Sequence, residues 1–174
     1  MIGPVDCPPA LASFVKPILG LTAWGVEHRS YGSWLAFQFG QPSLEIRELK
    51  SRRGRTAFVR GQWELRTNCC NWKIVQDGEQ IAWSEDDREI MARGAYKLNG
   101  QNLVRVSVPG NDGCSFFQFD LGGSLETWPY GDDDKDEQWT ICHESQYFNI
   151  NASGGYSLVQ GDTALDGEQW IALR

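Results

Sequence analysis

Four aspartates lie close together in the stretch GDDDKDEQW, and their spacing raises the question of calcium binding. Asp132, Asp134 and Asp136 alternate as the first ligands of an EF-hand loop do. However, Glu137 stands where such a loop needs glycine, and His143 stands where it needs a bidentate glutamate. We therefore expect an acidic loop in solvent, which could hold a divalent ion only adventitiously. The residues expected to contact a basic protein partner are Asp132, Asp133, Asp134 and Asp136.

The cysteines could bind a metal, but their spacing does not favour it. Cys69 and Cys70 are adjacent, so on a strand their side chains point to opposite faces and cannot easily hold one ion. No Cys-x-x-Cys pair, the usual spacing in structural zinc sites, occurs in the chain. We therefore predict no metal site, with one of these thiols buried and the other at the end of a strand.

A catalytic cysteine–histidine pair would have few residues to draw on. Cys142 and His143 are neighbours in sequence, but a thiol and its base must meet across space, and on a strand these two diverge. The other histidine is His28, so few acid–base pairs are available near neutral pH. Phosphate-binding, dinucleotide-binding, serine-hydrolase and zinc-protease motifs are absent. The sequence predicts no catalytic residue and no cofactor.

The charge balance narrows the choice of partner. The 174 residues carry a net charge of −7, and phosphate backbones and anionic lipids repel such a protein. Nucleic acid and membranes are therefore disfavoured as partners, and a basic protein is favoured, although the same acidity also serves solubility. The five cysteines are an odd number, two of them are adjacent, and no signal-peptide pattern is visible. These features indicate a cytoplasmic protein with reduced thiols.

Most of the chain has the residue types and alternation of β-strands. The stretch SLEIREL alternates Leu44 and Ile46 with Glu45 and Arg47, which predicts a strand whose leucine and isoleucine face the core. Hydrophobic residues make up 41% of the chain, enough for one sizeable core.

One long helix interrupts these strands. Ser84 is a suitable N-cap residue, the acidic residues after it complement the helix dipole, and Asn99–Gly100 provides a stop. We therefore expect a helix over about 84–98. The fold class is mainly β (α+β).

Two stretches, FQFGQPSLE from Phe37 and FQFDLGGSLE from Phe117, repeat nearly the same residues with an offset of eighty. The Gln-Trp pairs ending at Trp63 and Trp139 are separated by 76 residues. Further ordered matches are Gly20 with Gly100 and Gly78 with Gly154. The small differences in offset fall in expected loops, where insertions are tolerated, so the matches predict an internal duplication.

The duplication predicts two tandem β-meander repeats related by a pseudo-twofold axis. The first repeat spans about 18–83 and the second about 98–160, and the helix at 84–98 links them. Residues 161–174 would add a C-terminal strand. Because a unit of this size cannot bury its apolar face alone, the repeats should share one core within a single compact domain, 1–174. A sandwich and a closed barrel both remain open.

The residues that carry the second repeat also resemble a known group of proteins. The pattern L-x-G-x-x-L…V…F-x-F…G…L-E at Leu98–Glu126, followed by Glu-Gln-Trp at 137–139, resembles small uncharacterised bacterial β-rich proteins. Some of these occur in tandem, and a few are similar to immunity proteins of contact-dependent toxin systems. The pattern consists of core and turn residues, so the resemblance implies a fold and carries over no functional residue.

We expect a non-catalytic cytoplasmic bacterial binding protein, in its sharpest form an immunity-type protein that neutralises a basic toxin. The acidic surface would steer association with such a partner. One alternative is a binder of a small apolar or aromatic ligand, and another is an enzyme of unrecognised type. The oligomeric state is left open.

Overall fold

The computed structural model describes residues 7–29, 33–49, 53–161 and 169–173, and it is mainly β, with 51% strand and 14% helix. The helices are α1 (Pro9–Val15), the 3-10 turn η2 (Lys16–Ile18) and α2 (Arg88–Leu98). The strands are β1 (Trp24–His28), β2 (Leu35–Phe39), β3 (Ser43–Glu48), β4 (Arg55–Arg60), β5 (Trp63–Thr67), β6 (Cys70–Gln76), β7 (Glu79–Trp83), β8 (Leu103–Ser107), β9 (Ser115–Phe119), β10 (Gly123–Pro129), β11 (Glu137–His143), β12 (Gln146–Asn151), β13 (Gly155–Gln160) and β14 (Ile171–Ala172).

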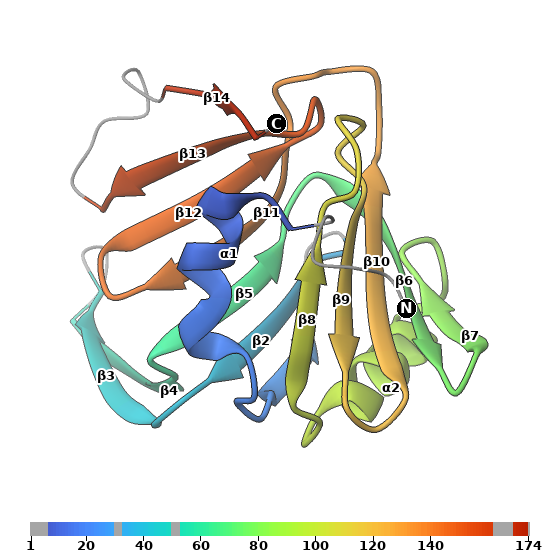
Figure 1. Ribbon diagram of the computed structural model, residues 1–174. Coiled ribbons are helices and arrows are strands. Elements are labelled where there is room, and N and C mark those ends of the chain that lie inside the picture. The colour runs from blue at the N-terminus through green and yellow to red at the C-terminus, as the bar shows by residue number, and fades with distance from the viewer. Residues whose placement is uncertain (1–6, 30–32, 50–52, 162–168, 174) are drawn as a thin grey trace.

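Two open antiparallel sheets form the body of the molecule (Figure 1). One has seven strands in the order β1-β2-β5-β11-β12-β13-β14, and the other has five in the order β7-β6-β10-β9-β8. Rings from the two sheets meet between them: Phe37 lies 6.1 Å from Phe119, and Phe117 lies 5.2 Å from Trp139, centroid to centroid. The core is therefore a layer of aromatic side chains between two sheets.

The helices cover the parts of this core that the sheets leave open. Phe14 of α1 places its ring 5.0 Å from Phe148 and 5.6 Å from Trp63, so α1 packs on the core face of the seven-stranded sheet. Helix α2 packs against the edge strands β1 and β7. No helix in the described part of the chain has the length and apolar character needed to cross a membrane.

Strands β3 and β4 form a separate two-stranded sheet, which we call the flap (residues 43–48 and 55–60). The flap connects β2 to β5, and its inner face lies over the outer face of the seven-stranded sheet. The prediction that Leu44 and Ile46 face the core is wrong, because their exposed fractions are 67% and 61%. Strand β3 alternates as predicted, but its polar side faces the seven-stranded sheet, because the outer face of that sheet is itself polar.

The second helix ends where predicted and begins later. Its last residue is Leu98, but its first is Arg88, four residues after the expected N-cap. Ser84 instead bonds strand β6, since its Oγ accepts from the backbone N–H of Trp72 at 3.3 Å. The carboxylate of Asp86 accepts from the N–H of Trp83 at 2.9 Å, so this acidic residue closes a turn before the helix.

The prediction of two matching meanders is not confirmed by the strand pairing. In the second half β9 pairs with β10 and β11 with β12, whereas in the first half β2 and β5 pair with each other and β3 pairs with β4. Of the predicted C-terminal strand over 161–174, the structure places β14, which pairs with β13. Residues 162–168 and 174 lie outside the described residues.

Gly61, between strands β4 and β5, cannot be replaced by another residue unless the neighbouring backbone shifts. A Cβ on Gly61 would lie 2.6 Å from the backbone O of Phe39 and 3.0 Å from its N. We expect Gly61→Ala to lower the free energy of unfolding by at least about 1 kcal/mol in urea denaturation. Gly131→Ala is the control, because its Cβ would meet nothing within 4 Å. Equal stability of the two variants would contradict the close approach at Gly61.

Candidate functional site

The predicted partner-binding aspartates lie in the loop between β10 and β11. Asp132, Asp133 and Asp134 are exposed, and Asp136 is half-buried. The Oδ1 of Asp133 accepts from the backbone N–H of Lys135 at 2.9 Å, so this carboxylate shapes its own turn. Within the described residues no group of three or more metal-ligating side chains could hold an ion. The loop is a solvated acidic surface.

A different site lies between the flap and the outer face of the seven-stranded sheet. A polar pocket of about 410 Å³ opens there. The flap contributes one wall, and strands β2, β5 and β12 and the residue after β1 contribute the other. The lining residues are Arg29, Gln38, Arg47, Phe58, Val59, Arg60, Glu64, Arg66 and Tyr147.

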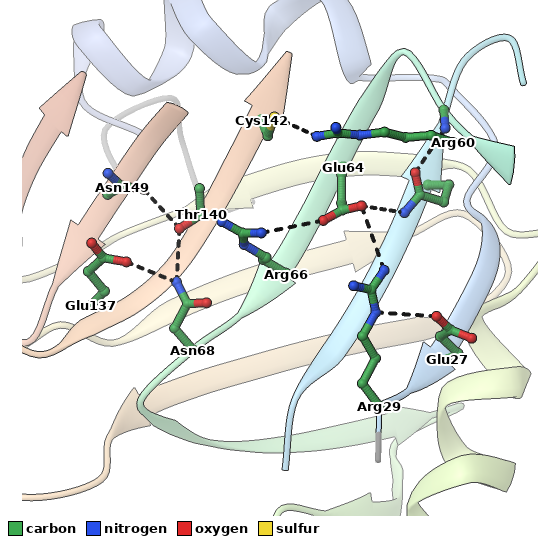
Figure 2. A network of polar contacts seen from close by, with 12 residues as sticks. Glu27, Arg29, Arg60, Glu64, Arg66, Asn68, Glu137, Thr140, Cys142 and Asn149 are labelled. Carbon is green, nitrogen blue, oxygen red and sulfur yellow. Dashed lines mark hydrogen bonds and ion pairs between the residues drawn. The ribbon is translucent and has the colours of Figure 1, made fainter. Parts of the chain in front are cut away.

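Glu64 occupies the centre of this site and is held from three directions (Figure 2). Its side chain is only 8% exposed. The Nε2 of Gln38 donates to Glu64 Oε2 at 2.8 Å. The guanidinium nitrogens of Arg29 and Arg66 lie 3.7 and 3.8 Å from the two carboxylate oxygens. A buried carboxylate is thus compensated on both sides, as burial of a charge requires.

The alternation of strand β5 explains how a glutamate comes to lie here. In WELRT, Trp63 and Leu65 face the aromatic core, so Glu64 and Arg66 must point to the opposite face of the sheet. Strand β2 does the same on its side, because Phe37 and Phe39 are buried in the core and Gln38 lies opposite Glu64 in register. These pairings place the polar side chains next to one another.

The flap supplies two further arginines. Arg60 donates from Nη1 to Glu45 at 3.4 Å and from Nη2 to the Sγ of Cys142 at 3.1 Å, which ties the flap to strand β11. Arg47 donates to the other oxygen of Glu45 at 3.0 Å, and its guanidinium lies 4.7 Å from the ring centre of Phe58. The bond to Cys142 joins the flap to the sheet, and the contacts within the flap order its inner face.

The charges around the pocket do not cancel. The ion pairs there connect four guanidinium groups with three carboxylates, which leaves an excess of one positive charge, 4 − 3 = +1. The members are Arg29, Arg47, Arg60 and Arg66 on one side and Glu27, Glu45 and Glu64 on the other. The pocket is therefore a local positive region in a protein whose net charge is −7.

A second group of polar side chains continues across the same face of the sheet (Figure 2). The Nδ2 of Asn68 donates to the Oγ1 of Thr140 at 2.9 Å, and that hydroxyl donates to the Oδ1 of Asn149 at 2.8 Å. Thr140 and Asn149 are buried. This chain of hydrogen bonds fixes strands β11 and β12 beside the pocket and holds its floor in place.

Cys142 and His143 point to opposite faces of strand β11, as predicted. The ring of His143 stacks on Trp63 with centroids 4.0 Å apart, on the core side, whereas the thiol of Cys142 faces Arg60. Burial raises the pKa of the Cys142 thiol, and the opposing effect of Arg60 does not restore it. The thiol is therefore protonated near neutral pH, and the pair does not form a nucleophile with its base.

The adjacent cysteines also divide as predicted. Cys69 is exposed just before strand β6, and Cys70 is buried, with burial raising the pKa of its thiol to about 12. Both are free thiols.

Thiol reactivity should follow this difference. Partial burial and the nearby Asp136 and Glu137 raise the pKa of the Cys69 thiol as well, but this thiol is exposed. We expect iodoacetamide at pH 8 to alkylate Cys69 at least about tenfold faster than Cys70 in the folded protein, because burial both shields the Cys70 thiol and raises its pKa to about 12. Peptide mapping by mass spectrometry over time measures both rates. In denaturant the two cysteines should react at similar rates. Equal rates in the folded protein would contradict the burial of Cys70.

Sequence reasoning missed the arginine-lined pocket altogether. Its residues come from separate segments between positions 29 and 147, and no short motif connects them. One local signal was present: WELRT places a glutamate and an arginine on the same face of a strand whose other face is apolar. Such a pair indicates a sheet that is polar on one face and packed on the other.

Comparison with known proteins gives no indication of function. No protein-family model matches the chain, and no match was found among curated proteins or among solved structures.

Proposed function

We propose that this protein is a non-catalytic binding protein and that the arginine-lined pocket binds an anionic group of its ligand. The observation that carries this proposal is the convergence of four arginines on one pocket around the buried Glu64, which pairs with two of them, with one positive charge in excess. The guanidinium group is suited to carboxylates and phosphates, because its planar fork donates two parallel hydrogen bonds.

The arginine of strand β5 supports the proposal most directly. Arg66 is 39% exposed, and its contact with Glu64 is an ion pair at 3.8 Å, which is beyond hydrogen-bond distance. Its N–H donors are therefore still available to a ligand in the pocket. Since six of the nine lining residues have charged or amide side chains, this pocket does not favour the alternative of an apolar or aromatic ligand.

An anion titration followed by NMR tests the proposal. The probes are sodium formate and sodium phosphate at constant ionic strength. We expect saturable shifts of the Gly61 amide, which donates to Gln38, and of the Gln38 side-chain amide, which donates to Glu64. Saturation measures the affinity of the pocket.

Two variants show whether those shifts report the pocket. Arg66→Gln should weaken binding of the anion at least about tenfold, because it removes a charged donor. Arg55→Gln should leave binding unchanged, because Arg55 lies at the far end of the flap, where it pairs with Glu48. If neither probe shifts the two signals saturably, or if both variants behave alike, the proposal fails.

A second candidate function rests on the exposure of the acidic loop. A basic protein, such as a toxin held by an immunity-type protein in a bacterial cytoplasm, could contact Asp132, Asp133, Asp134 and the half-buried Asp136. Charge attraction of this kind is screened over about 10 Å at 0.1 M salt, so association should slow as salt rises. Replacing the four residues by asparagine should flatten that dependence. An on-rate that is indifferent both to salt and to these replacements would exclude this candidate.

We also propose that the two halves arose by duplication and are related by a pseudo-twofold axis. Thr22 and Asn102 form an antiparallel bridge, and their separation of eighty residues equals the offset of the repeated words. The N–H of Gly20 donates to Leu103 O, and the N–H of Gly100 donates to Ala23 O, so each bond maps onto the other at the same offset. When each strand is matched with its counterpart in the other half, β1 and β2 correspond to β8 and β9, and β12 and β13 correspond to β6 and β7. The first strands of these pairs lie in the seven-stranded sheet, and their counterparts lie in the five-stranded sheet.

The buried residues of the helices repeat with the same offset of eighty residues. The buried residues of α1 and η2 are Leu11, Val15 and Ile18, and eighty positions later the buried residues of α2 include Met91, Ala95 and Leu98. Under this proposal α2 is the first element of the second unit, equivalent to α1, and not a linker.

Hydrogen exchange can test the equivalence. The amides of Gly20 and Gly100 should have protection factors within about tenfold of each other, because both donate to backbone oxygens of the opposite segment. Protection of one amide and rapid exchange of the other would contradict a twofold relation at this contact.

A further inference from the structure

We infer that the ligand of the arginine-lined pocket is a hydroxylated monocarboxylate, of the sugar-acid type. This inference rests on the proposed function, since it names the class of anion that the same pocket would take.

The charge of the pocket selects a monoanion. The four arginines and three glutamates around it leave an excess of one positive charge. A single carboxylate brings the cluster to neutrality, whereas a phosphate group near neutral pH carries about −1.5 to −2 and exceeds it. A zwitterion leaves the excess uncompensated, and Glu64 is not free for its ammonium group, because it already faces Gln38, Arg29 and Arg66.

The pocket offers far more hydrogen-bond donors than its charge implies. Four guanidinium groups carry about twenty N–H donors, and guanidinium groups accept none. The hydrogen bonds that these groups make in the described structure go to Glu27, Glu45 and Cys142 and use few of them. A ligand that suits this pocket has one negative charge and many acceptor oxygens. Hydroxyl groups add acceptors without adding charge, which is the composition of a sugar acid.

The size and lining of the pocket agree with this class. A volume of about 410 Å³ lies in the range of small-molecule sites and leaves room for a six-membered ring with its substituents. Phe58 and Val59 are the apolar residues of the lining, and Arg47 already lies against the ring of Phe58. A purely aromatic carboxylate could stack its ring on a guanidinium, as Phe58 does on Arg47, but that ring offers no acceptor oxygens to the remaining N–H donors.

A panel of small molecules tests the class on the whole protein. The probes are sodium D-glucuronate, sodium D-gluconate, methyl glucoside, sodium benzoate and sodium phosphate, each titrated at constant ionic strength with the Gly61 and Gln38 amide signals as readout. At least one sugar acid should bind at least about tenfold more tightly than benzoate, phosphate and methyl glucoside. Arg66→Lys, which keeps the charge and loses the planar fork, should weaken that binding. Arg55→Lys, at the far end of the flap, is the matched control and should not.

The outcomes separate this inference from the function on which it rests. If phosphate or benzoate binds as tightly as both sugar acids, the ligand class is wrong and the anion-binding function stands. If methyl glucoside matches glucuronate, the carboxylate contributes nothing and the ligand class is again wrong. If no charged probe shifts the two signals, the pocket binds no small anion, and both the class and the proposed function fail.

Discussion

Replacing Leu125 by alanine should lower the free energy of unfolding by about 2–5 kcal/mol, the usual cost of emptying a fully buried leucine site. Leu125 lies in the middle of strand β10, between β6 and β9, and its side chain is completely buried. The removed methyl groups leave a cavity against the aromatic rings of the core, which strands in the middle of a sheet cannot collapse to fill.

Leu44 provides the matched control, because it occupies the same place in the repeated word Ser-Leu-Glu. It lies on the outer face of the flap with an exposed fraction of 67%, so Leu44→Ala should change stability by less than about 0.5 kcal/mol. Urea denaturation of both variants measures the difference. Similar losses for the two would mean that the flap buries Leu44 in solution, contrary to its position here.

Leu125 and Leu44 show which part of the fold the sequence pattern predicts and which part it does not. Period-two alternation correctly predicts that residues 43–48 form a strand. It does not say which side of that strand meets the protein, because the choice depends on the surface beneath. Here that surface is the polar outer face of β2 and β5, so Glu45 and Arg60 face inward and Leu44 faces solvent.

The arginine-lined pocket could not be predicted for a related reason. Local patterns predict elements, but the pairing of β5 with both β2 and β11 is a contact between distant segments. Only that pairing places Gln38 and Cys142 on either side of Glu64. The aspartates of the acidic loop, by contrast, are neighbours in sequence, so their clustering was visible without a fold. Sequence reasoning therefore favoured the cluster it could detect over the one that folding assembles.

Glu64 supplies the negative charge at the centre of the arginine-lined pocket. Glu64→Ala should destabilise the protein by about 2–3 kcal/mol. Removing one partner of a fully buried ion pair costs about 3–5 kcal/mol, and the loss is smaller here because Arg29 and Arg66 are each about two-fifths exposed and retain water. Glu48→Ala is the control: its ion pair with Arg55 is exposed, so its loss should cost less than about 0.5 kcal/mol.

A second variant at the same position separates stability from binding. Glu64→Gln keeps the shape of the side chain and raises the excess charge of the cluster from one to two. We expect it to fold with a smaller loss than Glu64→Ala and to bind formate more tightly than the unaltered protein, because one opposing charge is removed from the pocket. Denaturation and the amide titration measure the two effects independently. If Glu64→Gln binds formate more weakly than the unaltered protein, Glu64 contributes to the anion site through its own contacts, and the electrostatic account of the pocket is wrong.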